Sequence, residues 1–240
     1  MEIPTKFIDK AKFVLKIFTD VETEYDFLLH LMSLTLDSVW RDHMLSKIYF
    51  SSEVRVLDLA CGTGLVTFDL ANSSPTPQMV VGLDPSPGML RIARRNKFRE
   101  RPDCPIEFVR AVGEFLPFRA EAFNYVTVGL AMRNFADKVA VFKESHKVLR
   151  RKGCFLSVDF VRPDNPLIWS IYRFHIFHVL PAIGGLVSSH WKMTLVYLAN
   201  SITIAARPGE LGNLLVEVGF RCTFLEKASF GIIALVGARK

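Results

Sequence analysis

The sequence is poor in cysteine, and its four cysteines follow no recognisable pattern. None of them forms a CxxC pair, and none has a histidine at the spacing of metal ligands. This distribution excludes a disulfide framework and a zinc site as organising features. It predicts free thiols in a reducing cytoplasm and no bound metal. The four are Cys61, Cys104, Cys154 and Cys222.

The sequence also lacks a long, uniformly apolar run. Its longest stretch without Asp, Glu, Lys or Arg, from Phe174 to Trp191, is interrupted by histidine, proline, glycine and serine. A membrane-spanning helix needs about 20 predominantly apolar residues, so we expect this stretch to form a lid or to lie on a surface. Charged residues at Asp9, Lys10 and Lys12 break up the N-terminus, which therefore does not match a secretory signal.

What the sequence does have is apolar bulk and positive charge. Its 240 residues are 50% hydrophobic, with a formal net charge of +6 and a mean hydropathy of +0.25. A basic cluster from Arg91 to Arg101 contains a single aromatic residue, Phe98, whereas single-stranded nucleic acids are bound by several stacking rings. The cluster is either a solvated helix face or a site for anionic lipid. We expect contact with a membrane surface and none with nucleic acid.

Short β-branched and apolar runs alternate with helical patterns along most of the chain, which predicts a parallel sheet with right-handed crossovers. The fold class is therefore α/β: a doubly wound, mostly parallel, Rossmann-like sheet of seven strands, with an antiparallel C-terminal hairpin and a helical lid insertion. The expected strands are Glu53–Ala60, Met79–Leu83, Ile106–Arg110, Phe123–Leu130, Cys154–Phe160, Phe220–Lys227 and Ile232–Ala238, with Arg150–Gly153 as the stop of the preceding helix.

We expect this chain to form a single domain, residues 1–240, with four parts. These are an N-terminal helical segment (1–50), a cofactor-binding core (51–162), a helical lid or substrate insertion (163–207), and a last helix with the closing hairpin (208–240). The insertion breaks the strand–helix rhythm, and its density of aromatic side chains favours a lipophilic substrate.

The strongest chemical signal follows the first expected strand. Gly62 and Gly64 let a ligand approach the backbone closely, and Asp58 stands at the end of the strand, where its carboxylate can accept from an ammonium group. Asp84 ends the second strand, twenty residues after Gly64, at the offset of an acid that binds ribose hydroxyls. Thr67 replaces the third glycine of nicotinamide and flavin sites. The pattern therefore favours S-adenosylmethionine, and the alternative is a glycine turn that serves packing only.

With these motifs in place, the sequence resembles the ubiquinone/menaquinone biosynthesis C-methyltransferases of the class I methyltransferase superfamily. The similarity runs from about Phe18 to the C-terminus. Two stretches are shared with the whole superfamily, Val56–Gly64 and Gly82–Leu90. Narrower matches to the family are Tyr25–Asp26, Leu31–Leu34, Trp40–Arg41, Met132–Lys138, Phe177–Pro181, Tyr197–Leu198 and Ser201–Ile202.

The chain departs from the family pattern at several places, among them Thr35 in place of a glycine and Cys61-Gly62 in place of a glycine pair. Leu29 and His30 stand where the family usually has an Asn-Asp pair, which concerns the substrate more than the cofactor. Val112 and Gly113 stand where an acid usually contacts the adenine, so backbone groups there are expected to bind it instead. The full set expected to bind the cofactor is Tyr25, Asp58, Ala60, Gly62, Gly64, Asp84, Pro85, Met89, Val112 and Gly113.

The candidates for catalysis are His178, Arg133, Asp159 and Tyr197. Histidine is a common general acid or base. His178 lies in the insertion, and its alternative is a core histidine. Arg133 follows the fourth expected strand and Asp159 ends the fifth, at the edge where ligands bind in open α/β sheets. Arg133 would stabilise a phenolate rather than act as a base, unless it simply pairs with Asp137. A helix cap is the alternative for Asp159.

The resemblance implies a methyltransferase that alkylates a ring carbon of a demethylated prenyl quinol, either demethylmenaquinol or a demethylated benzoquinol. The expected partners are this lipophilic quinol and, at the periphery, the inner face of the cell membrane, with a homodimer left open. One alternative is a class I methyltransferase for another lipophilic or small acceptor, such as a lipid amine, a sterol or a phenolic compound. Another is a non-catalytic scaffold with the same fold.

Overall fold

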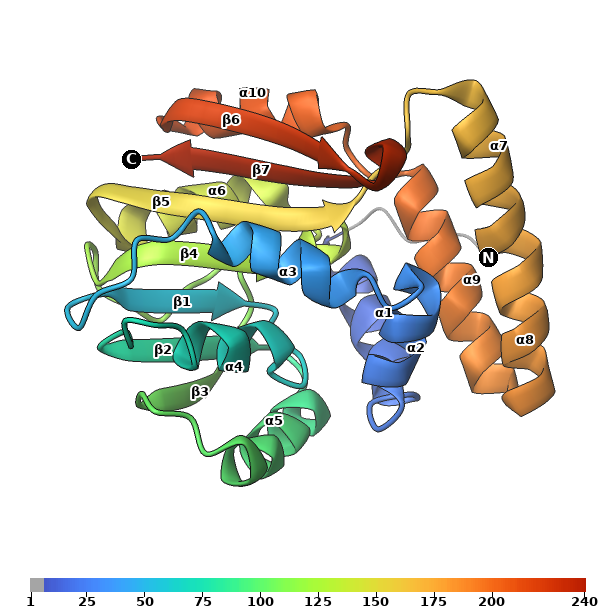
Figure 1. The fold of residues 1–240 in the computed structure, drawn as a ribbon, viewed down its shortest axis with the longest axis horizontal. Helices are drawn as coiled ribbons and strands as arrows, with labels where there is room; N and C mark the ends of the chain where they lie inside the picture. The colour runs from blue at the N-terminus through green and yellow to red at the C-terminus, as the bar shows by residue number, and fades with distance from the viewer. Residues whose placement is uncertain (1–6) are drawn as a thin grey trace.

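The computed structural model describes residues 7–240 as one mixed sheet with helices on both faces and at one end (Figure 1). Residues 1–6, part of the expected N-terminal helical segment, lie outside the described residues. The sheet has the order β3-β2-β1-β4-β5-β7-β6. Its strands are β1 (Arg55–Leu59), β2 (Met79–Asp84), β3 (Ile106–Arg110), β4 (Phe123–Gly129), β5 (Leu149–Phe160), β6 (Arg221–Ala228) and β7 (Ile233–Arg239).

The first five strands pair in parallel, and β7 pairs antiparallel with both β5 and β6. This arrangement confirms the expected seven-stranded, mostly parallel sheet with an antiparallel C-terminal hairpin. Most strands begin or end within two residues of the expectation, and the start of β5 differs by more. Residues 150–153 belong to β5 rather than to a helix stop, because Leu149 pairs with Phe123 of β4 and Gly153 accepts a hydrogen bond from the Lys240 amide.

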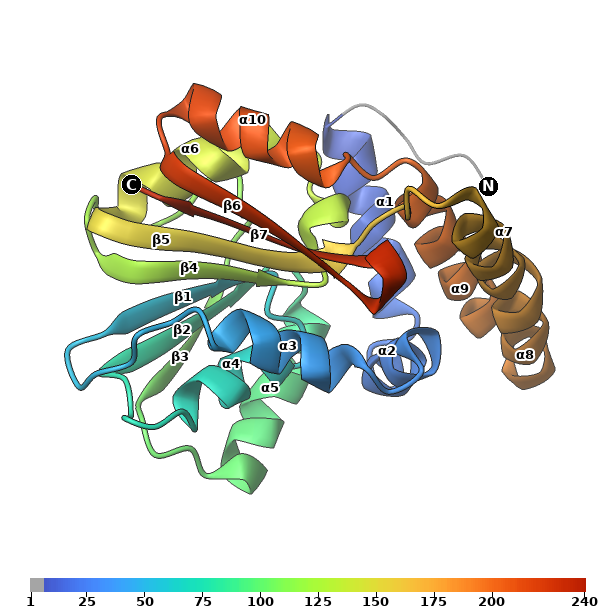
Figure 2. The same cartoon turned by 45° about the horizontal axis from the view of Figure 1, so that its top comes forward.

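Two apolar cores lie on the two faces of the sheet, because alternate residues of each strand point to opposite sides. Val56 and Val80 contribute to one core, and their neighbours Leu57 and Val81 contribute to the other. Figure 2 shows helices α3–α5 below the sheet and helices α6 and α10 above it. These are α3 (Asp37–Leu45), α4 (Leu65–Ala71), α5 (Pro87–Glu100), α6 (Lys138–Val148) and α10 (Pro208–Val218).

The remaining helices lie beyond the carboxyl ends of the parallel strands, to the right of the sheet in Figure 1. They come from two distant parts of the chain, the N-terminus and the stretch between β5 and α10. They are α1 (Phe7–Thr19), α2 (Tyr25–Ser33), α7 (Pro166–Phe174), α8 (Leu180–Val187) and α9 (Ser189–Thr203), with a π-helical turn, His175–Val179, joining α7 to α8. Ligands bind at this edge in open α/β sheets, so these helices surround the place where a site is expected.

Within residues 7–240, no helix is both long enough and apolar enough to cross a bilayer.

Candidate active site

A cavity of about 260 Å³ lies at the carboxyl ends of β1, β2 and β4. Side chains and backbone from the strand ends form its floor, and helices α1 and α2 form its cover. Nine of the ten residues expected to bind the cofactor line it: Tyr25, Asp58, Ala60, Gly62, Asp84, Pro85, Met89, Val112 and Gly113. The tenth, Gly64, is the residue that precedes α4, where its φ of 97° suits glycine.

The turn after β1 is held open toward this cavity. Ala60 and Gly62 both adopt positive φ angles, 54° and 56°, and the Cys61 amide donates to the Leu83 carbonyl of β2. A Cβ atom added to Gly62 would meet nothing within 4 Å, so this face of the turn is free to receive a ligand. A left-handed alanine costs about 1 kcal/mol or more, and such conformations concentrate at functional sites.

Asp58 is buried at the end of β1 with two hydroxyl groups as partners. The hydroxyl of Thr67 donates to one carboxylate oxygen at 2.7 Å, and that of Thr127 donates to the other at 3.0 Å. Burial raises the pKa of Asp58 to about 7, although these two hydrogen bonds lower it. The carboxylate therefore lacks a positive charge that would stabilise its ionised form.

Asp84 occupies the matching place at the end of β2. Its two oxygens accept from the backbone amides of Gly62 (2.9 Å) and Ser86 (2.8 Å), which ties the turn after β1 to the start of α5. Burial raises the pKa of Asp84 to about 6, against the effect of the two amides. Two carboxylates thus face one cavity, and both would be ionised more readily beside a cationic or hydroxyl-rich ligand.

The cover of the cavity comes from the N-terminal helices and is mostly apolar, with Lys12 as its charged residue. Val14, Leu15 and Phe18 of α1 line it together with Leu29 of α2. Sequence reasoning missed the α1 residues, because their helical spacing shows that one face is buried without showing against what. Leu29, which stands where the family usually has a polar residue, makes this wall more apolar.

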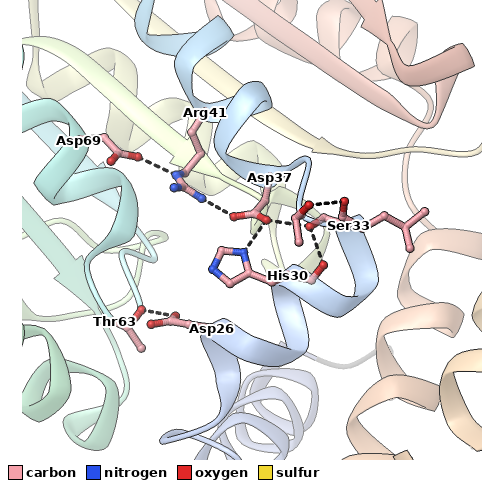
Figure 3. A network of polar contacts seen from close by, with 9 residues as sticks. Asp26, His30, Ser33, Asp37, Arg41, Thr63 and Asp69 are labelled. Carbon is pink, nitrogen blue, oxygen red and sulfur yellow. Dashed lines mark hydrogen bonds and ion pairs between the residues drawn. The ribbon is translucent and has the colours of Figure 1, made fainter. Parts of the chain in front are cut away.

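Figure 3 shows how α2 and α3 are fastened above the turn after β1. Asp26 accepts from the hydroxyl of Thr63 at 2.5 Å, which joins α2 to the glycine turn. Asp37 is fully buried and bonds His30, Ser33 and Arg41 (Figure 3).

Arg41 reaches onward from this network to Asp69 of α4, with 2.6 Å between Nε and Oδ2 (Figure 3). Hydrogen bonds from His30 and Ser33 keep the pKa of Asp37 low despite the cost of burial. The cover is therefore attached to the core by charged groups as well as by apolar contacts.

Three of the four catalytic candidates gather in one buried cluster beside the cavity. Arg133 forms an ion pair with Asp159, and its Nε donates to the hydroxyl of Ser201 at 3.1 Å. The Tyr197 hydroxyl donates to Oδ1 of Asn134 at 2.8 Å, and Asn134 itself lines the cavity.

The contacts of Arg133 and Asp159 decide between the structural alternatives that the sequence left open for each of them. Arg133 pairs with Asp159, whereas Asp137 accepts from the Ala140 amide at the start of α6. Asp159 also accepts from the Arg133 amide at 2.8 Å, so it fixes the segment after β4 rather than capping a helix of the insertion. Asn134 was not singled out from the sequence, although it lies within the Met132–Lys138 match.

The structure does not bring His178 to this cluster or to the cavity. Its side chain is exposed on the π-helical turn, with its ring 5.3 Å from that of Phe174. The insertion also differs from the expected lid over the site, because none of its residues lines the cavity. Trp169 and Leu180 are buried among helices, whereas Phe174 faces solvent, and α1 rather than the insertion lines the cavity.

The loop after β3 contributes backbone rather than charge. Val112, Gly113 and Glu114 line the cavity, but the Glu114 carboxylate accepts from the amides of Ala136 (3.1 Å) and Asp137 (3.4 Å). A Cβ atom on Gly113 would lie 2.7 Å from the ring of Phe135. Glycine is therefore needed here for the loop after β4 to close against the loop after β3.

The family model for the ubiE/COQ5 methyltransferase family matches residues 6–240. The chain belongs to this family. A ubiquinone/menaquinone biosynthesis C-methyltransferase of Geobacter sulfurreducens is 32% identical over 232 residues, which cover 97% of this chain and 90% of that protein.

Two further comparisons agree with the family assignment. A demethylmenaquinone methyltransferase of Lactiplantibacillus plantarum is 29% identical over 218 residues, covering 91% of this chain and 92% of that protein. The crystal structure of an SAM-dependent methyltransferase from Thermotoga maritima has a TM-score of 0.66 and 16% identity, covering 95% of this chain and 99% of that one. At that identity the likeness concerns the fold, which is that of the class I methyltransferases.

This ubiE/COQ5 family member is an S-adenosylmethionine-dependent methyltransferase, and the residues that line its cavity fit that cofactor. Asp58 offers a carboxylate without a cationic partner, as the cofactor's ammonium requires. Asp84 offers a second carboxylate to a ribose diol, and the open side of Gly62 gives the ligand access to the backbone between them.

Proposed function

We propose that this enzyme transfers the methyl group of S-adenosylmethionine to a ring carbon of a demethylated prenyl quinol in respiratory quinone biosynthesis. The relatives named above support this reaction. The structural observation that carries it is the composition of the cavity. One wall holds the two carboxylates of the cofactor motifs, and the opposite wall is the apolar side of α1 and α2. Such a cavity suits a polar cofactor that meets a hydrophobic ring.

The chain contributes alignment and exclusion of water to this reaction. S-adenosylmethionine, when bound, supplies an electrophilic methyl group. We propose that Asp58 and Asp84 fix its two ends, and that Phe18 and Leu29 hold the acceptor ring against it. Alignment of two reactants at about 3 Å in a dry site accounts for several kcal/mol of a barrier.

Arg133 supplies positive charge rather than a base. Burial disfavours its charged form, but the carboxylate of Asp159 more than compensates, so the pKa of Arg133 is raised. Its Nη2 atom is buried and has no hydrogen-bond partner within residues 7–240. We propose that this fixed cation favours the phenolate form of the acceptor, in which the ring carbon next to the oxygen is nucleophilic. Asp159 and Ser201 act by positioning it, and Tyr197 orients Asn134 at the cavity.

An acceptor with an isoprenoid tail resides in a membrane. We therefore propose that the enzyme works as a peripheral protein at the inner face of the cell membrane.

The test is methyl transfer from labelled cofactor to reduced demethylmenaquinol and to a demethylated benzoquinol, each in detergent. We expect label on a ring carbon of at least one product, located by NMR, and its loss in a variant with Asp84→Asn. If neither quinol is methylated while the cofactor binds tightly, the acceptor belongs to another class, such as a sterol or a lipid amine.

A further inference from the structure

The outer surface of α7 is apolar although it faces solvent. Leu167, Ile171 and Phe174 recur at the spacing of one helical face, and their side chains are 69%, 65% and 61% exposed. On the opposite side of the same helix, Trp169 and Tyr172 are buried. A helix that is apolar on both sides needs a second apolar neighbour, and residues 7–240 bury only one of its two faces.

This apolar surface continues past the π-helical turn onto α8. His178 is exposed on the turn, with its ring close to Phe174. At the far end of α8, Leu186 and Val187 are 89% and 57% exposed. Figure 1 shows α7 and α8 at the outer edge of the molecule, with α9 between them and the sheet. The exposed side chains thus extend along one edge of the protein that other elements leave uncovered.

The charges around this edge are mostly positive, and the exposed Asp164, which precedes α7, is paired with Lys227. Arg173 of α7 and Lys192 of α9 are exposed, and the sequence from residue 165 to residue 209 contains neither aspartate nor glutamate. Carboxylates near an apolar patch would repel an anionic surface, whereas cations beside it attract one. Amphipathic helices that lie in a lipid interface combine large apolar side chains with flanking cations in this way.

We propose that the outer face of α7 and α8 docks on the surface of an anionic phospholipid bilayer. This docking face consists of Leu167, Ile171, Phe174, Leu186 and Val187, with Arg173 and Lys192. The apolar side chains enter the interface, and the two cations contact lipid phosphates. The inference rests on the proposed function in one respect, since an acceptor with an isoprenoid tail gives the enzyme a reason to lie at a bilayer.

The basic cluster of α5 is the rival surface. Its charges are partly engaged, because Arg91 pairs with Glu22, and Arg94 and Lys97 donate to the carbonyl oxygens of Phe108 and Ile106. Phe98 is its one large exposed apolar side chain. Charge alone gives weak, salt-sensitive association, whereas the docking face of α7 and α8 adds a large apolar contribution.

The experiment is flotation of the full chain with vesicles of phosphatidylcholine, with and without phosphatidylglycerol. We expect the wild-type protein to float with both, and more strongly with phosphatidylglycerol. A variant carrying Leu167→Ser, Ile171→Ser and Phe174→Ser should lose at least about tenfold in vesicle affinity. A matched control with Arg94→Ser and Phe98→Ser on α5 should bind as the wild type does.

A second pair of substitutions separates the two contributions. Arg173→Gln with Lys192→Gln should abolish the preference for phosphatidylglycerol and leave binding to phosphatidylcholine unchanged. Circular dichroism and the melting temperature verify that each variant is folded. Equal vesicle binding by the triple variant and the wild type would overturn the proposal, as would a loss confined to the α5 variant. The proposal would also be overturned if neither protein floats with vesicles and the triple substitution instead dissociates a dimer in sedimentation.

The readout also separates this inference from the proposed function. In solution, with a tail-less demethylated quinol, the triple variant should methylate as fast as the wild type, because its substitutions lie outside the cavity. Absence of methyl transfer by both proteins, with vesicle binding lost only in the variant, would remove the proposed quinol and leave the docking face in place. Normal methyl transfer by both proteins, with equal vesicle binding, would keep the proposed quinol and remove the docking face.

Discussion

At the scale of single residues, two buried carboxylates define the chemistry of the cavity. Asp58 and Asp84 have raised pKa values because burial disfavours their charge, and their hydrogen-bond donors are neutral hydroxyls and amides. Neutral donors stabilise an ionised carboxylate less than a cation does. A bound ligand with an ammonium group and a ribose diol would therefore lower the pKa values of both carboxyls.

We expect cofactor affinity to rise with pH. A ligand cation stabilises ionised Asp58, so the free protein must first lose the proton that it holds below its pKa of about 7. Binding should be at least about tenfold tighter at about pH 7.5 than at about pH 5.5, with proton release that calorimetry in paired buffers detects. In the Asp58→Asn variant, cofactor affinity should vary little with pH. Equal wild-type affinity at both pH values would contradict the assignment.

Substitution of Asp84 by asparagine should weaken cofactor binding without unfolding the protein. The amide keeps one oxygen to accept from Gly62 or Ser86, but it lacks the charge that strengthens hydrogen bonds from ribose. We expect about ten- to a hundredfold weaker binding by calorimetry, with a melting temperature close to that of the wild type. Glu107→Gln, on an exposed residue of β3, is the matched control. Unchanged affinity in Asp84→Asn would remove Asp84 from the site.

The sequence predicted the polar side of the cavity much better than its apolar side. Asp58, Gly62 and Asp84 follow parallel strands, and the carboxyl ends of such strands meet at one edge. Val14 and Phe18 come from a helix whose partner cannot be read from its own periodicity. His178 illustrates the same limit, because a helix that is apolar on both sides does not reveal which side faces inward.

At the scale of elements, the pair of Arg133 and Asp159 joins the end of β5 to the segment after β4. Both groups are buried, and Asp159 also accepts from the Arg133 amide. The guanidinium lies over the ring of Phe160, with 5.3 Å between Cζ and the ring centroid. The position of Asn134, which lines the cavity, therefore depends on this ion pair.

Asp159→Asn should destabilise the protein more than most substitutions do. It leaves Arg133 buried without a counter-charge, and breaking a buried pair in this way costs about 3–5 kcal/mol. Urea unfolding measures the loss. Replacing both partners by apolar residues, with Arg133→Met and Asp159→Leu, should recover much of the stability and none of the methyl transfer. A loss below about 1 kcal/mol for Asp159→Asn would show that the pair contributes little to the fold.

Most elements were predictable because their signals are local. The strand β3 has the expected bounds, and the last helix begins at residue 208 as expected, since proline marks its start. The start of β5 was not predictable, because its first residues are extended only through pairing with β4 and the C-terminal residue. The π-helical turn also has no sequence signal of its own.

At the scale of the whole molecule, the site is shared between parts of the chain that lie far apart in sequence. The core sheet holds the carboxylates, and α1 and α2 cover them. A ligand in the cavity therefore contacts both the rigid sheet and the helices fastened above it, and it should stabilise their association.

We expect cofactor binding to slow hydrogen exchange in α1 and α2. Their amides exchange when the cover separates from the sheet, and a ligand held between the two opposes that opening. Exchange in α7 and α8 should stay unchanged, because their residues do not line the cavity. The protein with Asp84→Asn, at the same cofactor concentration, is the control and should show no slowing. Equal exchange in α1 with and without cofactor would contradict its role as a cover.

Helix α1 packs against segments that are translated much later. Phe13 and Phe18 contact the ring of Tyr197 in α9, with centroid distances of 5.7 and 5.9 Å, and Lys10 Nζ donates to the Phe135 carbonyl at 2.8 Å. During synthesis on the ribosome, α1 emerges with its apolar side uncovered and waits for these partners. The part of the chain translated first is therefore among the last to reach its place, and a nascent enzyme stays unable to enclose its cofactor until α9 has been released.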